Sequence, residues 1–241
     1  MITAICAIAL AIIHLFSGKL QFIRAKPRSR WLSFGSGVSV AYVFVHILPE
    51  LSKAQITLQS SLNIELAFLE HHVYLVALLG LAVFYGLERF ANKSRQRNQK
   101  AGKGDVTALD VFWIHIASFA VYNALIGYLL VHREESSIKS LLFYSFAMAL
   151  HFVVNDNGLR ENHKQIYDRI GRWLLVAAII VGWVIGIGTV IHQAAVAVLF
   201  AFLSGGIVLN VLKEELPEER ESRFWAFALG TFGYAILLLA L

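Results

Sequence analysis

The sequence predicts an all-α integral membrane protein, with eight transmembrane helices in a single domain over residues 1–241. Hydrophobic residues make up 58% of the chain, and charged residues make up only 15%. A soluble domain of this size could not bury so much apolar surface, so lipid is the expected solvent. Eight apolar stretches each provide the ~20 residues that a helix needs to cross a bilayer.

The eight predicted spans follow one another with short connections. The stretch 51–67 is short and mixed, so we expect an outer loop with a fragment of surface helix there. Residues 91–106 are polar and basic, which predicts a flexible inner loop. The predicted spans are residues 2–23, 31–52, 68–90, 109–132, 138–157, 173–192, 194–213 and 222–241.

The basic residues indicate how the spans are oriented. If the N-terminus lies outside, every Lys and Arg except Lys53, Arg133 and Lys139 falls on the inner side. This bias follows the positive-inside rule, so both termini are expected to be extracytoplasmic, in a plasma (inner) membrane. The basic residues neither gather on one face nor alternate with aromatic residues. The pI of about 9.4 therefore does not predict nucleic-acid binding.

An internal repeat links the second and seventh predicted spans. Ser, Gly, Leu, Pro and Glu occur at the same offsets in residues 36–50 (SGVSVAYVFVHILPE) and 204–218 (SGGIVLNVLKEELPE). Because these spans are predicted to run in opposite directions, the two copies form an inverted repeat, as is common in secondary transporters. The repeated prolines, Pro49 and Pro217, are also expected to end their helices at the membrane surface.

Polar residues inside the apolar spans are the candidates for function, because such residues are costly in lipid and usually face a bundle interior. His151 and Asn155 lie four residues apart and share a helix face, while Asn123 lies in the preceding span. Imidazole and amide groups can bind a transition metal or form an interhelical hydrogen-bond network. His14 and His115 are isolated polar residues on apolar faces, and they are interpreted as core histidines whose hydrogen bonds are satisfied.

His46 and Glu50 repeat the four-residue spacing near the outer end of the second span, where they form a candidate entrance for cations. The alternative is that they are solvated residues of a helix end. Gly182 and Gly186 form a GxxxG pattern, which predicts either internal packing or a homodimer face.

Several function classes are excluded. The single cysteine, Cys6, rules out a cysteine-rich zinc site. No phosphate-binding loop, Ser/His/Asp order or pair of catalytic acids occurs in the sequence, so the protein is not expected to be an enzyme.

The second span, GSGVSVAYVFVHILPEL, resembles the second helix of the Zrt/Irt-like (ZIP) metal-ion transporters. The third, seventh and eighth spans are similar to the corresponding helices of that family. The resemblance implies a 3+2+3 bundle in which three helices, a central pair and three inverted helices enclose a metal path. In this arrangement the path runs between the fourth and fifth spans.

The fourth span contains YNALIG, residues 122–127, where the family has a His-Asn pair followed by a carboxylate and a glycine. Asn123 and Gly127 match this pattern. Tyr122 stands in place of the histidine, and Ile126 stands in place of the carboxylate.

The fifth span contains HFVVND, residues 151–156, where the family has His or Gln, then Glu four residues later, then Gly. His151 matches, whereas Asn155 and Asp156 replace the glutamate and the glycine. With these carboxylates missing, any metal is expected to be single and weakly held.

The resemblance implies a transporter that moves a divalent metal cation, of the zinc, iron or manganese type, toward the cytoplasm. No permanent cofactor is expected, and the predicted partners are the metal cation, the lipid bilayer and a possible second copy in a homodimer. The alternative is a divergent ZIP-fold protein that transports a non-metal solute, or that regulates or binds without transporting. The candidate metal ligands are Asn123, His151, Asn155, Asp156, His46 and Glu50.

Overall fold

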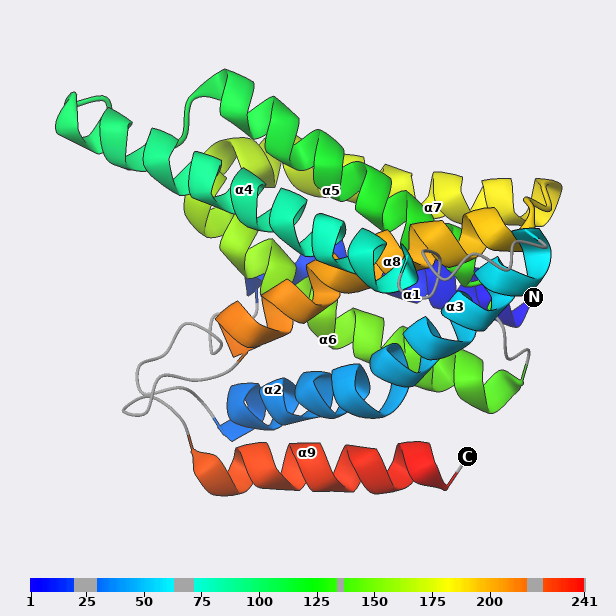
Figure 1. Ribbon diagram of the computed structural model, residues 1–241. Helices are drawn as coiled ribbons and strands as arrows, with labels where there is room; N and C mark the ends of the chain where they lie inside the picture. The colour runs from blue at the N-terminus through cyan, green and yellow to red at the C-terminus, as the bar shows by residue number, and fades with distance from the viewer. Residues whose placement is uncertain (20–29, 63–71, 134–136, 216–222, 241) are drawn as a thin grey trace. The chain divides into compact units, whose positions relative to one another are not determined.

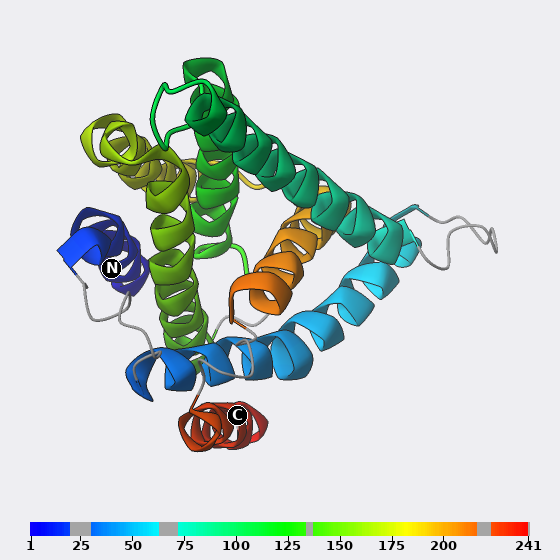
Figure 2. The same cartoon turned by 90° about the vertical axis from the view of Figure 1, so that its left-hand side faces the viewer.

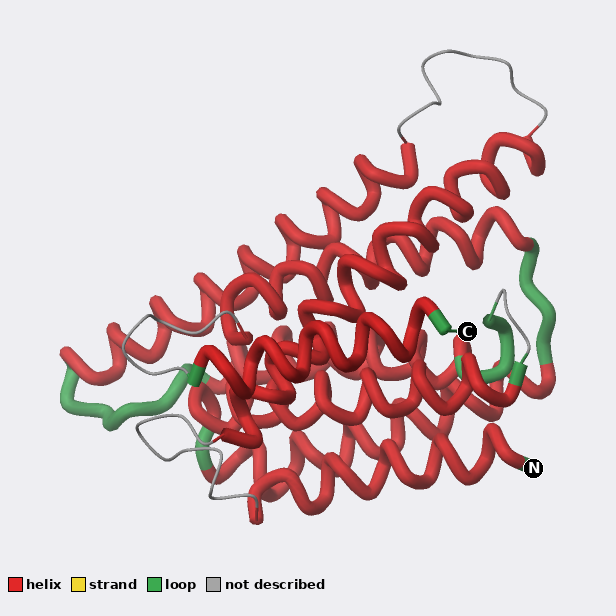
Figure 3. Tube along the Cα trace, turned by 90° about the horizontal axis from the view of Figure 1, so that it is seen from below, coloured by secondary structure: helices red, strands yellow, loops and turns green. Residues whose placement is uncertain are grey.

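The computed structural model describes residues 1–19, 30–62, 72–133, 137–215 and 223–240 (Figure 1). Within these ranges every regular element is helical and no strand occurs (Figure 3), which confirms the predicted all-α class. The elements are α1 (Ile2–Phe16), η1 (Ser17–Lys19), α2 (Arg30–Tyr42), η3 (Val43–Ile47), α3 (Leu48–Leu62), α4 (His72–Lys100), α5 (Leu109–Leu129), α6 (Ile138–His163), η5 (Tyr167–Gly171), α7 (Arg172–Gly188), α8 (Gln193–Asn210), η6 (Val211–Glu215) and α9 (Phe224–Leu239).

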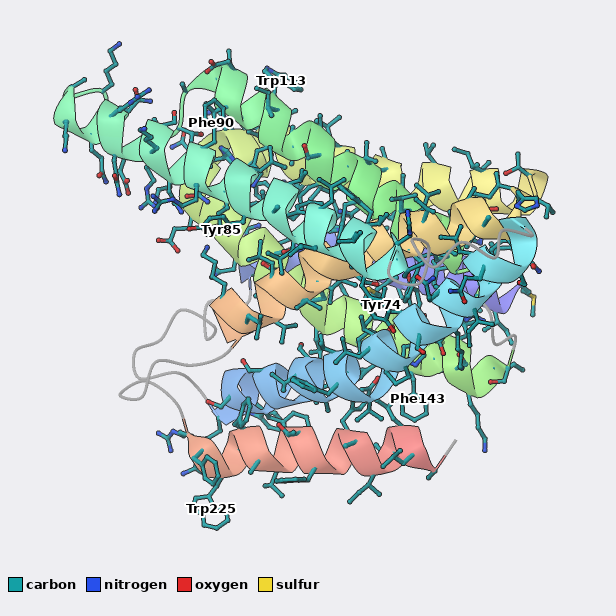
Figure 4. All side chains as sticks on the ribbon, in the orientation of Figure 1. Tyr74, Tyr85, Phe90, Trp113, Phe143 and Trp225 are labelled. Carbon is teal, nitrogen blue, oxygen red and sulfur yellow. The ribbon has the colours of Figure 1, made fainter. Side chains whose placement is uncertain are left out.

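Seven of the described helical segments are long and apolar enough to cross a membrane. The eighth predicted span corresponds to α9, an apolar helix of 16 residues. Large aromatic side chains project outward from these helices, such as Trp225 on α9 and Trp113 on α5, which are 80% and 46% exposed (Figure 4). Exposed apolar surface of this extent is typical of a protein that lies in a membrane. The seven segments are Ile2–Lys19, Ser33–Ser60, His72–Lys100, Leu109–Leu129, Ile138–His163, Tyr167–Gly188 and Gln193–Lys213.

The contacts between helices divide the chain into two compact units. Unit 1 contains Met1–Leu20 and Tyr85–Thr189, and unit 2 contains Gln21–Phe84 and Val190–Leu241. In unit 1, α1 and α6 run in the direction opposite to α5 and α7 (Figure 1). In unit 2, α2 and α9 lie side by side and run one way, whereas α8 runs the other way (Figures 1 and 2).

Three pairs of helices pack backbone against backbone through glycines: α2 with α9, α8 with α4, and α5 with α7. A Cβ atom added to Gly37 of α2 would lie within 3.0 Å of the backbone of Phe227 on α9. In return, a Cβ atom added to Gly230 of α9 would meet the backbone of Phe34. Small residues permit such close approach between helices in a membrane. The equivalent contacts are Gly205 with Ala77 and Gly80 with Phe202 for the second pair, and Gly127 with Ile179 and Gly182 with Ala124 for the third.

The two copies of the sequence repeat have the same local structure. A π-helical turn occupies Val43–Ile47 in the first copy and Val211–Glu215 in the second, at the same offset from the repeated serine. The repeated glycines, Gly37 and Gly205, are the ones that pack tightly against α9 and α4. Within unit 2, α2 and α8 run in opposite directions (Figure 1), as expected of an inverted repeat.

The prediction that Pro49 ends its helix is wrong, because α3 continues to Leu62 through residues that were expected to form an outer loop. Proline lacks an N–H group, and its ring clashes with the carbonyl four residues back in a regular α-helix. Here a wider π turn precedes the proline, and the Leu48 amide donates to the Val43 carbonyl, five residues back. The wider turn gives the ring room. The equivalent Pro217 lies outside the described residues.

The prediction of a flexible loop over residues 91–106 is also wrong in part, because α4 continues to Lys100. Gln, Lys and Arg are good helix formers, so a polar composition does not end the helix. The connection that follows is held by Asp105, which accepts a hydrogen bond from Arg95 Nη2 at 2.7 Å and pairs with Lys164 Nζ at 3.3 Å.

Asp105→Asn is expected to loosen the connection between α4 and α5 without unfolding the helices. Hydrogen bonds from Arg95 and Lys164 hold the pKa of the Asp105 carboxyl well below its ordinary value of 3.8. A lowered pKa means that the interaction is fully present above pH 3.8 and is lost as the pH falls through the lower value of the folded state. Hydrogen exchange of residues 101–106 should be faster in the variant at neutral pH, and the difference should vanish in strong acid. Equal exchange at neutral pH would contradict this role.

Candidate functional site

Six buried polar side chains gather inside unit 1. We call this set the polar cluster, and every member is at most 7% exposed. The helices that supply these side chains belong to segments apolar enough to cross a membrane, where polar groups need partners within the protein. The members are His14 from α1, Tyr122 and Asn123 from α5, and His151, Asn155 and Asp156 from α6.

His14 joins three helices. Its Nδ1 atom lies 2.8 Å from Asp156 Oδ1 on α6, and its Nε2 atom lies 2.8 Å from Asn123 Oδ1 on α5. The amide nitrogen of Asn123 donates to the Phe119 carbonyl at 2.8 Å, which leaves the amide oxygen facing His14. Because that oxygen can only accept, the Nε2 atom of His14 carries a hydrogen.

One further hydrogen lies between His14 Nδ1 and Asp156 Oδ1. The pair is therefore either an imidazolium with a carboxylate or an imidazole with a carboxylic acid, and it is neutral overall in both forms. The ring of Phe152 covers the imidazole of His14, with the two ring centroids 4.4 Å apart. Because the pair is buried under apolar side chains, neither His14 nor Asp156 can exchange its partner for bulk water.

His151 is the centre of a second set within the cluster. Its Nε2 atom lies 2.7 Å from the Tyr122 hydroxyl and 3.0 Å from the amide nitrogen of Asn155. Because an amide nitrogen can only donate, Nε2 accepts, and the hydrogen of the neutral imidazole is on Nδ1. His151 and Asn155 thus lie on one helix face, as their four-residue spacing indicates.

Two atoms of the polar cluster have no hydrogen-bond partner in the described part of the chain: His151 Nδ1 and Asp156 Oδ2. The hydroxyl of Tyr167 in η5 has no partner of standard hydrogen-bond geometry there either, but it lies within reach of the Asp156 carboxyl group, to which it can donate. An electrostatic interaction between His14 and His151 makes the two sets neighbours. Buried polar atoms without partners are typical of places where a water, an ion or a ligand binds.

The four predicted inner ligands, Asn123, His151, Asn155 and Asp156, all belong to the polar cluster, but two residues were missed. His14 is a buried core histidine with its hydrogen bonds satisfied, as interpreted from the sequence, but it is not isolated, because it joins Asn123 to Asp156. Tyr122, which was not among the predicted ligands, is the partner of His151. For His14 the available signal was an ionisable residue inside an apolar span.

The predicted outer ligands, His46 and Glu50, belong to unit 2. Glu50 Oε1 accepts a hydrogen bond from Lys53 Nζ at 2.6 Å. The ring of His46 stacks on Tyr42, with centroids 4.9 Å apart. His46 lies inside the π turn Val43–Ile47, where the helix is wider, so a four-residue spacing no longer guarantees a common face.

Within the described residues, no group of three or more His, Cys, Asp or Glu side chains is arranged to hold a metal ion. The polar cluster instead combines imidazole and a single carboxylate with amide and phenol oxygens. Imidazole suits zinc, copper, iron and nickel, whereas the neutral oxygens are weaker donors for these ions. A donor set of this kind suits weak binding better than a permanent site.

A chain of charged groups links the polar cluster to the end of unit 1 that carries Arg160 and Asp168. Arg160 lies four residues after Asp156 on α6, and its Nε donates to Asp168 Oδ1 at 2.7 Å. Its Nη2 donates to Ser17 Oγ at 3.3 Å, and its guanidinium lies over the Tyr167 ring, 5.1 Å from the centroid. We call this end of unit 1 the basic end.

A second pair of buried histidines lies near the basic end. His115 Nδ1 and His163 Nε2 are 2.9 Å apart, and His163 Nδ1 lies 2.5 Å from Thr107 Oγ1. His115 is a buried core histidine with a hydrogen-bond partner, as interpreted from the sequence, but it is not isolated. Its partner was not predicted because α6 continues to His163, beyond the predicted end of the fifth span.

No protein-family model, no curated protein and no solved structure matches the chain. The function is therefore inferred from the polar cluster, from its burial inside apolar helices and from the motifs of the sequence itself.

Proposed function

We propose that the protein is a membrane transporter that moves a divalent metal cation, of the zinc, iron or manganese type, toward the cytoplasm, and that the polar cluster is its binding site. The observation that carries the proposal is the fully buried set of His14, Asn123 and Asp156, which lies inside apolar helices. Ionisable groups inside membrane spans usually mark the path of an ion or a substrate. The resemblance to ZIP transporters also implies a metal path between the fourth and fifth spans, which correspond to α5 and α6.

The unpartnered atoms of the cluster suggest how a cation would be held. Asp156 Oδ2 is a carboxylate-type oxygen, and His151 Nδ1 is an imidazole nitrogen. Transition-metal cations accept both kinds of donor. Binding through His151 Nδ1 requires the imidazole hydrogen to move to Nε2, from where it can donate to the hydroxyl of Tyr122, 2.7 Å away. The amide of Asn155 must then turn, because its nitrogen can no longer donate to Nε2.

The internal repeat is a second line of support for a transporter. Each copy has a glycine in close contact with a neighbouring helix, Gly37 against α9 and Gly205 against α4. In each copy a π turn follows at the same offset. Repeats of opposite direction underlie alternating access in many secondary transporters. A site that binds weakly fits this cycle, because the ion must leave on the other side.

His151→Ala is expected to reduce metal uptake by roughly tenfold or more, because it removes one donor and leaves Tyr122 and Asn155 without their shared partner. The measurement is uptake of Zn²⁺, Fe²⁺ and Mn²⁺ into sealed vesicles that contain the purified protein. His132→Ala is the matched control, because His132 also belongs to unit 1 but its Nε2 bonds to the backbone carbonyls of Gly186 and Thr189. Unchanged uptake by the His151 variant at normal expression would remove His151 from the mechanism.

A second candidate function is transport of a non-metal solute by the same cluster. The observation that favours it is that the described residues contain no group of three or more His, Cys, Asp or Glu side chains suited to a metal. The vesicle experiment separates the two candidates, since wild-type vesicles that take up none of the three ions would exclude the first. A protein that regulates or binds without transporting would show no flux of any solute.

A further inference from the structure

We propose that His115 and His163 form a second binding station for a divalent transition-metal cation, near the basic end of unit 1. The role of this station in transport rests on the proposed function. Metal binding at the station can be tested without any transport measurement.

The two imidazoles already face each other at nearly the separation that a shared metal requires. His115 Nδ1 and His163 Nε2 are 2.9 Å apart. Two nitrogens at ~2.05 Å from a tetrahedral zinc ion would be about 3.3 Å apart. The ion would lie to one side of the line between the two nitrogens, so an opening of roughly 0.4 Å, together with a tilt of both rings toward a shared point, would admit it.

The two rings can change to the tautomers that bind a metal while the pair keeps the same number of hydrogens. At present one hydrogen lies between His115 Nδ1 and His163 Nε2. If each neutral ring instead carries its hydrogen on its other nitrogen, two lone pairs face each other. That arrangement is repulsive when nothing lies between the rings, and a cation between them stabilises it.

Thr107 supplies the contact that favours this form. Its Oγ1 lies 2.5 Å from His163 Nδ1, so a hydrogen on Nδ1 can be donated to the hydroxyl while Nε2 stays free for the metal. Histidines that bind metals usually have such a partner on their other nitrogen. The backbone amide of Thr107 donates to the Asn162 carbonyl at 3.3 Å, which attaches the hydroxyl to the end of α6.

The surroundings favour weak and reversible binding. His115 and His163 are 4% and 1% exposed. The Phe112 ring lies edge-on to His163 with centroids 5.2 Å apart, and the Phe119 ring lies edge-on to His115 at 5.1 Å. Two imidazoles are fewer protein ligands than a structural metal site uses, which suits an ion that must leave again.

The position of the pair fits a step on the way out of the polar cluster. His115 and Tyr122 lie two helical turns apart on α5, about 10 Å at a rise of 1.5 Å per residue. Phe119 lies between them, with its ring centroid 6.0 Å from that of Tyr122. The histidine pair therefore lies on the side of Tyr122 that is nearer to the connection between α4 and α5.

The test is Co²⁺ binding to the full-length protein in detergent, followed by the visible absorption of the ion and by competition with Zn²⁺. It is carried out in the wild type and in His151→Ala, so that Co²⁺ at the polar cluster is recognised separately. His115→Gln and His163→Gln are each expected to weaken binding at the station at least tenfold. Thr107→Val, which keeps both imidazoles and leaves the core intact, is expected to weaken it about tenfold.

His132→Gln is the control and should leave Co²⁺ binding unchanged. Loss of binding in the His115 and His163 variants, with the control unaffected, would establish the station. A wild-type protein that binds no Co²⁺ at millimolar concentration, or a Co²⁺ affinity that none of the three variants changes, would overturn the inference. If the vesicles take up no metal while the protein in detergent still binds Co²⁺ at the station, only the proposed function is contradicted and the station stands.

Discussion

Replacing His14 alone by leucine is expected to lower the free energy of unfolding by about 3–5 kcal/mol, because it leaves the carboxyl group of Asp156 buried without its partner. The two side chains are 1% and 0% exposed, and the bonded atoms are 2.8 Å apart. Water cannot replace the imidazole in this position. Asp156→Leu is expected to have a similar effect, since it leaves His14 Nδ1 without its partner.

The double variant, His14→Leu with Asp156→Leu, separates stability from function. Apolar residues that replace both members of a buried pair are often tolerated well, so the double variant should be more stable than either single variant. Metal uptake should be lost in all three. Unfolding in detergent gives the double-mutant cycle. If the stability loss of the double variant equals the sum of the two single losses, the pairing is contradicted.

Gly182→Ala is expected to destabilise unit 1 by about 1–3 kcal/mol, although it adds only one methyl group. The added Cβ would lie within 3.0 Å of the backbone of Ala124 on α5, where no side chain can turn aside. The two helices would have to separate along the whole contact between α5 and α7. Thermal unfolding in detergent measures the loss.

Gly188→Ala on the same helix is the matched control, because a Cβ atom added at Gly188 meets nothing within 4 Å. This variant should be as stable as the wild type or gain up to ~1 kcal/mol, the difference between the two residues in a helix interior. Equal stabilities of the Gly182 and Gly188 variants would contradict the close packing of α5 on α7.

The helical spans could be predicted from composition because lipid leaves the backbone no alternative to internal hydrogen bonds. The predicted spans 109–132 and 194–213 correspond closely to α5 and to α8 with η6. The helix ends were harder to predict, as Pro49 and His163 show. A proline can be accommodated by a π turn, and a polar helix end can be held by contacts with other helices.

The sequence by itself determined which polar side chains enter the apolar spans, and the spacing that places His151 and Asn155 on one helix face. Only the tertiary structure decided the partners across helices. His14 and Asp156 are 142 residues apart in the chain, and His115 and His163 are 48 residues apart. Helical periodicity relates residues within a few turns of each other, whereas contacts between distant helices depend on how closely and in what register their backbones pack.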